Sequence, residues 1–189
     1  PLGLPQGTAV YKIAIAGAST LLGKELKDAV SESTLAAASF TLLDEDEGLG
    51  QLDQVGDEVT FVQAIDPHSF EHVDFTFFCG SESLTHRHWR EALKAGSTVI
   101  DLSGALDHEP GVLVRASWLQ SDSGAPDLFT PAVVPAHPAA IALGLLLARL
   151  QQAAPLRVAS ATMLAPASEF GRAAMDELHQ QTVNLLSFQ

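Results

Sequence analysis

Short apolar runs that end at glycine or at an acidic residue restrict the possible fold more than any other feature of this sequence. The first run, Lys12–Ala16, ends at Gly17 and is followed by Leu21–Val30, in which apolar residues recur at helical spacing. Apolar runs without polar alternation are typical of strands that are buried on both faces of a parallel sheet. We expect further strands at Ser39–Leu43, Val59–Gln63, Phe75–Phe78, Thr98–Asp101 and Ala132–Val134.

Helical segments separate these runs. A helix of about three turns is expected to follow Ser83 and to end at Ala95, with Gly96 as its C-terminal cap. An apolar helix is expected over Pro138–Ala153, and Leu102–Pro131, which is rich in glycine, proline and serine, is expected to be mostly loop. Strands that alternate with helices in this way predict an α/β fold with a doubly wound, mostly parallel, Rossmann-like sheet.

The last part of the chain does not fit into that sheet. After Pro155 we expect one longer strand, Arg157–Leu164, and one amphipathic helix, Ser168–Leu186. One strand and one helix are too little for a domain, so this part either packs on the first domain or belongs to a longer chain, and we favour the second reading. The predicted domains are therefore residues 9–154 and an incomplete second domain over residues 155–189.

The composition excludes several classes of function. The 189 residues include 23 acidic and 10 basic side chains, a net charge of −13, which disfavours binding to nucleic acid. No apolar run reaches the roughly 18 residues that a membrane helix needs. A single cysteine excludes a disulfide framework and fits a reducing, cytoplasmic setting. We therefore expect a cytoplasmic protein that binds neither nucleic acid nor membranes.

The turn between the first strand and the first helix is the strongest candidate for a binding site. Gly17 and Gly23 enclose it, and Thr20 stands where a middle glycine would help a phosphate to approach. Backbone N–H groups and the helix dipole at such a turn attract anions. The alternative is that the two glycines serve only the packing of strand and helix.

Asp44, at the end of the second predicted strand, is placed where an acid can accept hydrogen bonds from the ribose of a dinucleotide. The alternative is a solvated loop charge. The four carboxylates of Asp44–Glu47 would repel a 2′-phosphate, so the prediction is NAD rather than NADP, or no cofactor. The residues predicted to bind the cofactor are Gly17, Ser19, Thr20, Leu21, Leu22, Asp44, Cys79 and Gly80.

Other reactive side chains give weaker signals. Cys79 is expected to be a buried strand-end residue, because a nucleophilic cysteine needs exposure and a nearby base. His86 and His88 do not share a helix face and are not expected to bind a metal, and His137 has no evident partner. Asp101 either lies at a ligand-binding sheet edge or caps the following turn.

Several segments together resemble the aspartate-semialdehyde dehydrogenase family of amino-acid biosynthesis. They are Ile13–Ser19, Val73–Gly80, Ala95–Ala105 and Ala174–Leu186, and the stretch Val99–Leu106 is most similar to the Usg-type homologues, which often lack the enzyme's residues. The resemblance implies a Rossmann-like NADP-binding domain, followed by the start of an α+β domain through which two subunits pair. It therefore implies a homodimer for the full-length protein.

The family reduces an acyl phosphate to a semialdehyde through a cysteine thioester, but this sequence departs from that chemistry. On an ungapped match, Pro138 stands at the position of the acylating cysteine, Asp107 at that of the substrate-binding arginine, and Ala165 at that of a glutamine. The family's later catalytic histidine lies beyond the matched region. The resemblance with these losses predicts a catalytically inactive homologue with a binding or assembly role. The alternative is an NAD(P)-linked oxidoreductase that acts on an aldehyde or an acyl phosphate.

Overall fold

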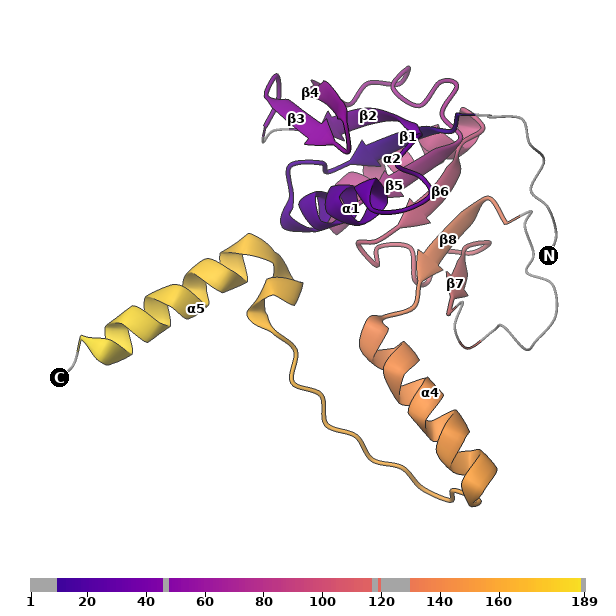
Figure 1. Cartoon of the computed structure of the whole chain (residues 1–189), viewed down its shortest axis with the longest axis vertical. Helices are drawn as coiled ribbons and strands as arrows, with labels where there is room; N and C mark the ends of the chain where they lie inside the picture. Colours follow the sequence, from indigo (N-terminus) through magenta and orange to yellow (C-terminus); the bar gives the residue numbers. More distant parts are fainter. Residues whose placement is uncertain (1–9, 46–47, 117–118, 120–129, 188–189) are drawn as a thin grey trace. The chain divides into compact units, whose positions relative to one another are not determined.

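The computed structural model describes residues 10–45, 48–116, 119 and 130–187, so Asp46 and Glu47 lie outside the described residues. The chain divides into two compact units (Figure 1). Unit 1 comprises Pro1–Val114 and Asp127–Pro135, and unit 2 comprises Arg115–Pro126 and Ala136–Gln189. The domain boundary predicted at residue 154 stays a prediction.

The described strands form one eight-stranded sheet with the order β3-β4-β2-β1-β5-β6-β8-β7. The neighbouring pairs from β4 through β2, β1, β5 and β6 to β8 are parallel, whereas β3 runs antiparallel to β4. This arrangement confirms the predicted α/β fold with a mostly parallel sheet. The strands are β1 (Lys12–Ala16), β2 (Ser39–Asp44), β3 (Leu52–Val55), β4 (Glu58–Ala64), β5 (Phe75–Phe78), β6 (Thr98–Asp101), β7 (Leu113–Arg115) and β8 (Ala132–Pro135).

Both faces of the central strand β1 are buried from Ile13 to Ala16, which explains why this strand lacks polar alternation. Ile13 and Ile15 of β1 pack in one apolar cluster with Val30 of helix α1 (Leu21–Ser31). Ala14 belongs to a second cluster, which includes Trp89 of helix α2 (Glu82–Lys94). Successive side chains of a strand point to opposite faces, so α1 and α2 cover opposite faces of the sheet.

The order of the strands also marks the place where a ligand can bind. Strand β2, which follows β1 in the chain, lies on one side of β1. Strand β5, which comes later in the chain, lies on the other side of β1. In doubly wound sheets, ligands bind outside the carboxyl ends of the strands at such a reversal. The Gly17 turn follows β1 and therefore lies at this point.

The structure differs from the sequence-based expectations in some elements. Leu52–Val55 and Leu113–Arg115 are strands that the sequence does not indicate, since both are short and lie at or near polar loops. Helix α2 begins after Ser81 rather than Ser83, because the Ser81 side chain accepts a hydrogen bond from the backbone N–H of Leu84.

The predicted strand Arg157–Leu164 is wrong, because the described residues there form no strand. A strand is stable only when its backbone groups pair with a neighbour, and none of the described strands pairs with this segment. Val158 and Leu164 are 87% and 96% exposed.

Unit 2 contains two long helices. Helix α4 (Pro138–Ala153) confirms the predicted apolar helix, and α5 (Gly171–Leu186) follows a short 3₁₀ helix, η1 (Ala167–Phe170). Leu178, Leu185 and Leu186 of α5 are exposed. Over the described part of the chain, no helix is both long enough and apolar enough to span a bilayer.

Candidate functional site

Backbone contacts hold the turn after β1 close to the ends of β2 and β5. The N–H groups of Gly17 and Ala18 both donate to the carbonyl oxygen of Leu43, at 2.8 and 3.1 Å. Gly17 has φ +85°, and a Cβ added there would lie 2.4 Å from the backbone nitrogen of Gly80. A Cβ at Gly23 would lie 2.4 Å from the carbonyl oxygen of Gly17. Both glycines are therefore required by packing, whether or not a ligand binds.

Thr20, which replaces the middle glycine of the usual motif, points into the turn. Its Oγ1 lies 2.8 Å from the carbonyl oxygen of Gly17 and 2.8 Å from that of Cys79. The same oxygen accepts a hydrogen bond from the N–H of Gly23 and so caps α1. The side chain therefore connects β1, β5 and α1, and its hydroxyl does not face outward.

Asp44 also turns toward this segment. Its carboxylate accepts the backbone N–H of Ser19 at 3.0 Å and that of Glu45 at 2.9 Å. The side chain is buried, since the residue is only 7% exposed, so the alternative of a solvated loop charge is wrong. Binding of ribose by Asp44 stays a prediction.

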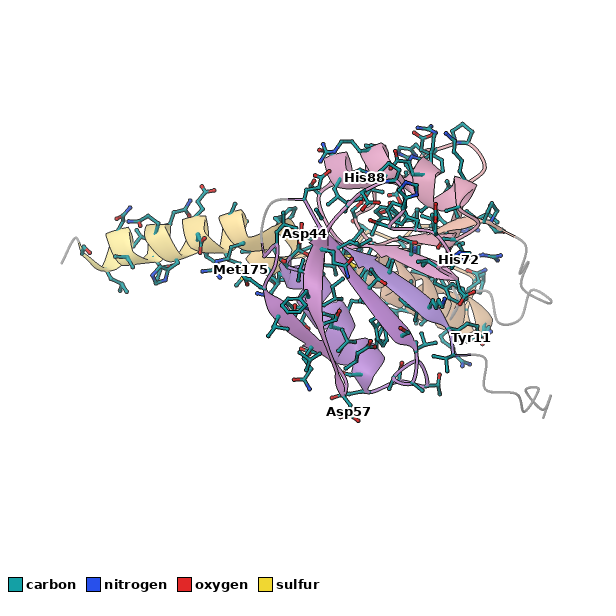
Figure 2. The ribbon with its side chains drawn as sticks, turned by 90° about the horizontal axis from the view of Figure 1, so that it is seen from above. Tyr11, Asp44, Asp57, His72, His88 and Met175 are labelled. Carbon is teal, nitrogen blue, oxygen red and sulfur yellow. The ribbon has the colours of Figure 1, made fainter. Side chains whose placement is uncertain are left out.

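All eight residues predicted to bind a cofactor meet at the carboxyl ends of β1, β2 and β5. Figure 2 shows Asp44 toward the end of the sheet that lies away from Tyr11, the residue before β1. Among the described residues, the backbone N–H groups of Leu21 and Leu22 in the first turn of α1 have no hydrogen-bond partner. Two free donors at the positive end of a helix dipole fit a phosphate group. The turn therefore fits the anionic part of a dinucleotide at the start of α1.

The thiol of Cys79 is buried, as predicted. The residue is 2% exposed, and burial raises the pKa of the thiol to about 12, with a further increase from the nearby carboxylate of Asp101. A nucleophilic cysteine requires a lowered pKa and access to solvent. At neutral pH this sulfur is a protonated, inert core atom.

We expect Cys79 to react about 10³-fold more slowly with a soluble disulfide reagent at pH 8 in the folded chain than in urea, because its thiolate fraction falls by that factor. The raised pKa also means that the stability contributed by the protonated thiol is present below about pH 8.5 and is lost as the pH rises toward 12. Release of the coloured thiol product measures the rate. Equal rates in the folded and the unfolded chain would contradict the burial.

A charged cluster that the sequence does not indicate lies beside Asp44. The carboxylate of Glu45 accepts hydrogen bonds from both Nε and Nη2 of Arg87, at 2.9 Å for Nε, and lies 3.0 Å from Nε2 of His88. The Arg87 hydrogen bond, with His88, lowers the pKa of the Glu45 carboxyl against the effect of its burial. No spacing in the sequence indicates this pair, because 42 residues separate Glu45 from Arg87.

The expectation that the four carboxylates of Asp44–Glu47 repel a 2′-phosphate is changed for two of them, because Asp44 and Glu45 have partners in the structure. Asp44 is bound to backbone N–H groups, and Glu45 is paired with a cation. Asp46 and Glu47 lie outside the described residues.

Asp101 caps the turn that follows β6, which was one of its two predicted roles. Its carboxylate accepts the N–H and the hydroxyl of Ser103 at 2.8 and 2.6 Å, and the N–H of Leu106 at 2.9 Å. The residue is fully buried. These bonds compensate the buried charge, so Asp101 is a structural residue here.

His137 has partners that the sequence did not reveal. Its Nδ1 accepts the N–H of Ala139 at 3.2 Å, which caps α4, and its Nε2 bonds to the carboxylate of Glu169. The expectation that His137 lacks a partner is therefore wrong. In the part of the chain that the structure describes, no three His, Cys, Asp or Glu side chains gather as a metal site requires.

The sequence of this domain matches a known family profile, described as the semialdehyde dehydrogenase NAD-binding domain, over residues 12–161. The chain belongs to the semialdehyde dehydrogenase family. This finding confirms the resemblance that the segments around Gly17, Cys79 and Asp101 predicted.

Curated relatives in this family carry two kinds of name. The chain is 31% identical over 179 residues to a USG-1 protein homolog of Pseudomonas aeruginosa, covering 93% of this chain and 52% of the relative. It is 28% identical over 178 residues to an aspartate-semialdehyde dehydrogenase of Prochlorococcus marinus, covering 93% and 50%. The chain thus spans about half the length of the curated relatives it matches.

Solved structures of the family share the fold. An aspartate semialdehyde dehydrogenase II from Vibrio cholerae superposes with a TM-score of 0.81 at 20% identity, over 94% of this chain and 53% of the other. A probable aspartate-semialdehyde dehydrogenase from Pseudomonas aeruginosa gives a TM-score of 0.73 at 25% identity, over 95% and 53%.

Proposed function

We propose that this member of the semialdehyde dehydrogenase family binds a nicotinamide dinucleotide and does not form the acyl-enzyme of its active relatives. The observation that carries the proposal is the residue at the start of α4. Pro138 stands there, and a proline ring offers no nucleophile. Proline is well suited to the first turn of a helix, so the position supports the helix and not the chemistry.

No other residue supplies the missing sulfur. The chain has one cysteine, Cys79, whose buried thiol keeps its proton at neutral pH. Covalent acyl transfer needs a thiolate that can attack the acyl carbon and later leave. Without that nucleophile, the rate of acyl transfer is expected to fall by many powers of ten.

Two more substitutions support the same proposal. Asp107 is an exposed anion at the position of the family's substrate-binding arginine, and an anion repels an acyl phosphate. Ala165 carries no amide at the position of the family's glutamine.

The retained turn after β1 supports nucleotide binding. Leu21 and Leu22 present two N–H groups at the start of α1, and Gly17 keeps the turn close to β5. In the active enzymes a bound dinucleotide supplies hydride transfer, whereas here we propose binding alone. We propose a binding or assembly role in a cytoplasmic homodimer of the full-length protein, with NAD preferred to NADP.

Calorimetric titration and a turnover assay test this function. We expect the purified chain to bind NAD at up to millimolar concentration, and to show no acyl-phosphate reduction with NADH or NADPH above the rate without protein. An active aspartate-semialdehyde dehydrogenase of the family serves as the positive control for turnover. Dinucleotide-linked turnover that is lost in Cys79→Ser would overturn the inactive assignment and favour an oxidoreductase. No binding of either dinucleotide would leave only an assembly role.

A further inference from the structure

The Glu45–Arg87 ion pair is the best-defined charged feature at the proposed dinucleotide site. We infer that Glu45 and Arg87 together select against a 2′-phosphate on the adenosine ribose, with Glu45 occupying the guanidinium that such a phosphate would bind. The inference rests on the proposed function, because it concerns the specificity of the same site.

The position of the pair follows from the fold. Glu45 comes directly after Asp44, the last residue of β2. In dinucleotide-binding sheets, the acid at the end of this strand reaches the ribose 2′-hydroxyl, and a nearby arginine accommodates a 2′-phosphate. Arg87 lies on α2, and the sequence neighbour His88 is drawn in Figure 2 toward the same end of the sheet as Asp44. A cation therefore lies where a 2′-phosphate would need one.

The geometry of the pair shows why Glu45 and a phosphate exclude each other. Two nitrogens of Arg87, Nε and Nη2, meet the two oxygens of the Glu45 carboxylate. A phosphate uses the same planar, two-pronged face of a guanidinium. The Nη1 atom of Arg87 donates to the hydroxyl of Ser83 at 2.6 Å, and Nε2 of His88 lies 3.0 Å from Oε1 of Glu45, the oxygen that Nε of Arg87 also contacts. The pair is held in place by both neighbours.

Removing the carboxylate should therefore turn the pair into a phosphate site. In Glu45→Gln the negative charge is lost, and the two nitrogens that contact the Glu45 carboxylate, Nε and Nη2 of Arg87, face a neutral amide that an incoming phosphate can displace. The double variant Glu45→Gln/Arg87→Gln removes both charges. It should therefore not show the increased affinity for a 2′-phosphate that we expect of Glu45→Gln. Glu32→Gln makes the same change in net charge at an exposed residue that caps the far end of α1, and it is the matched control.

Two small nucleotides isolate the 2′-phosphate. 5′-AMP and adenosine 2′,5′-bisphosphate differ only in that group, so calorimetry with both measures its contribution directly. We expect Glu45→Gln to bind the bisphosphate about tenfold more tightly than the original chain. One additional charge-assisted hydrogen bond to the 2′-phosphate is enough for a gain of this size. Binding of 5′-AMP should change less than about twofold, which is within the scatter of an exposed charge pair.

Each outcome decides the inference. A gain for the bisphosphate in Glu45→Gln that is absent in Glu32→Gln and in the double variant supports it. Unchanged bisphosphate affinity in Glu45→Gln, with 5′-AMP and NAD still bound, overturns the inference and leaves the proposed function intact. A gain that persists in the double variant also overturns it, since Arg87 would then not be the receptor. Failure of every variant to bind any nucleotide overturns the inference and nucleotide binding together.

Discussion

Replacing Gly17 with alanine should lower the free energy of unfolding by about 2 to 5 kcal/mol, a sum of left-handed backbone strain and overpacking. Gly17 has φ +85°, and a new methyl group would lie 2.4 Å from the nitrogen and 2.5 Å from the Cα of Gly80. Both contacts are with backbone atoms of the segment after β5, so no side-chain rotation relieves them. Urea denaturation followed by circular dichroism measures the loss.

Gly96 provides the matched control for this experiment. Its φ is +91°, close to that of Gly17, but a Cβ there meets nothing within 4 Å. Gly96→Ala therefore reports backbone strain alone and should cost about 1 to 2 kcal/mol. Equal losses in the two variants would show that the contact between Gly17 and Gly80 carries no steric restriction.

Replacing Asp101 with alanine should lower the free energy of unfolding by about 3 to 5 kcal/mol, because it leaves buried donors without an acceptor. The carboxylate now accepts two hydrogen bonds from Ser103 and one from the N–H of Leu106. The exposed Asp107 of the same loop is the control, and Asp107→Ala should change the stability by less than about 0.5 kcal/mol. Thermal and urea unfolding of the two variants give the comparison.

The conservative variant Asp101→Asn separates charge from packing. Asp101 raises the pKa of the Cys79 thiol, so removing its charge should lower that pKa, although burial still holds it above the ordinary value. Titration of the thiolate absorbance with pH would detect the change. An unchanged Cys79 pKa in a folded Asp101→Asn chain would show that the two groups do not interact.

The parallel core of the fold could be predicted because local signals and burial agree there. Phe75–Phe78 and Thr98–Asp101 are short apolar runs with a defined end, and the structure has these strands at the predicted bounds. Helix α1 has a capping threonine at its start and helical spacing of its apolar residues. At these places the hydrophobic pattern and the local turn chemistry favour the same structure.

Features that depend on a distant partner could not be predicted in the same way. The strand Leu52–Val55 exists because it pairs with Glu58–Ala64 in an antiparallel hairpin, and its own residues are mostly polar or exposed. Arg157–Leu164 shows the converse, since its composition favours a strand but no described strand pairs with it. The contact of Glu45 with Arg87 likewise joins positions far apart in the chain.

In the candidate site, too, some features could be predicted from the sequence and others depend on distant contacts. The sequence indicates Gly17, Asp44 and Gly80 because strand ends of a parallel sheet meet at one edge. It does not indicate where the Asp44 carboxylate points, since its bond to the Ser19 N–H depends on the final conformation of the turn. Position can be predicted from topology, whereas orientation requires the folded structure.

The three contacts of the Thr20 hydroxyl have a consequence for the thermodynamics of any ligand that arrives there. One oxygen joins the end of β1, the end of β5 and the first turn of α1. A flexible phosphate loop loses conformational entropy when a ligand orders it, but this loop is already ordered when the chain folds. The middle glycine of the usual motif leaves room for a ligand but makes the turn less rigid. Thr20 leaves less room and makes the turn more rigid, so the turn is preorganised before any ligand binds.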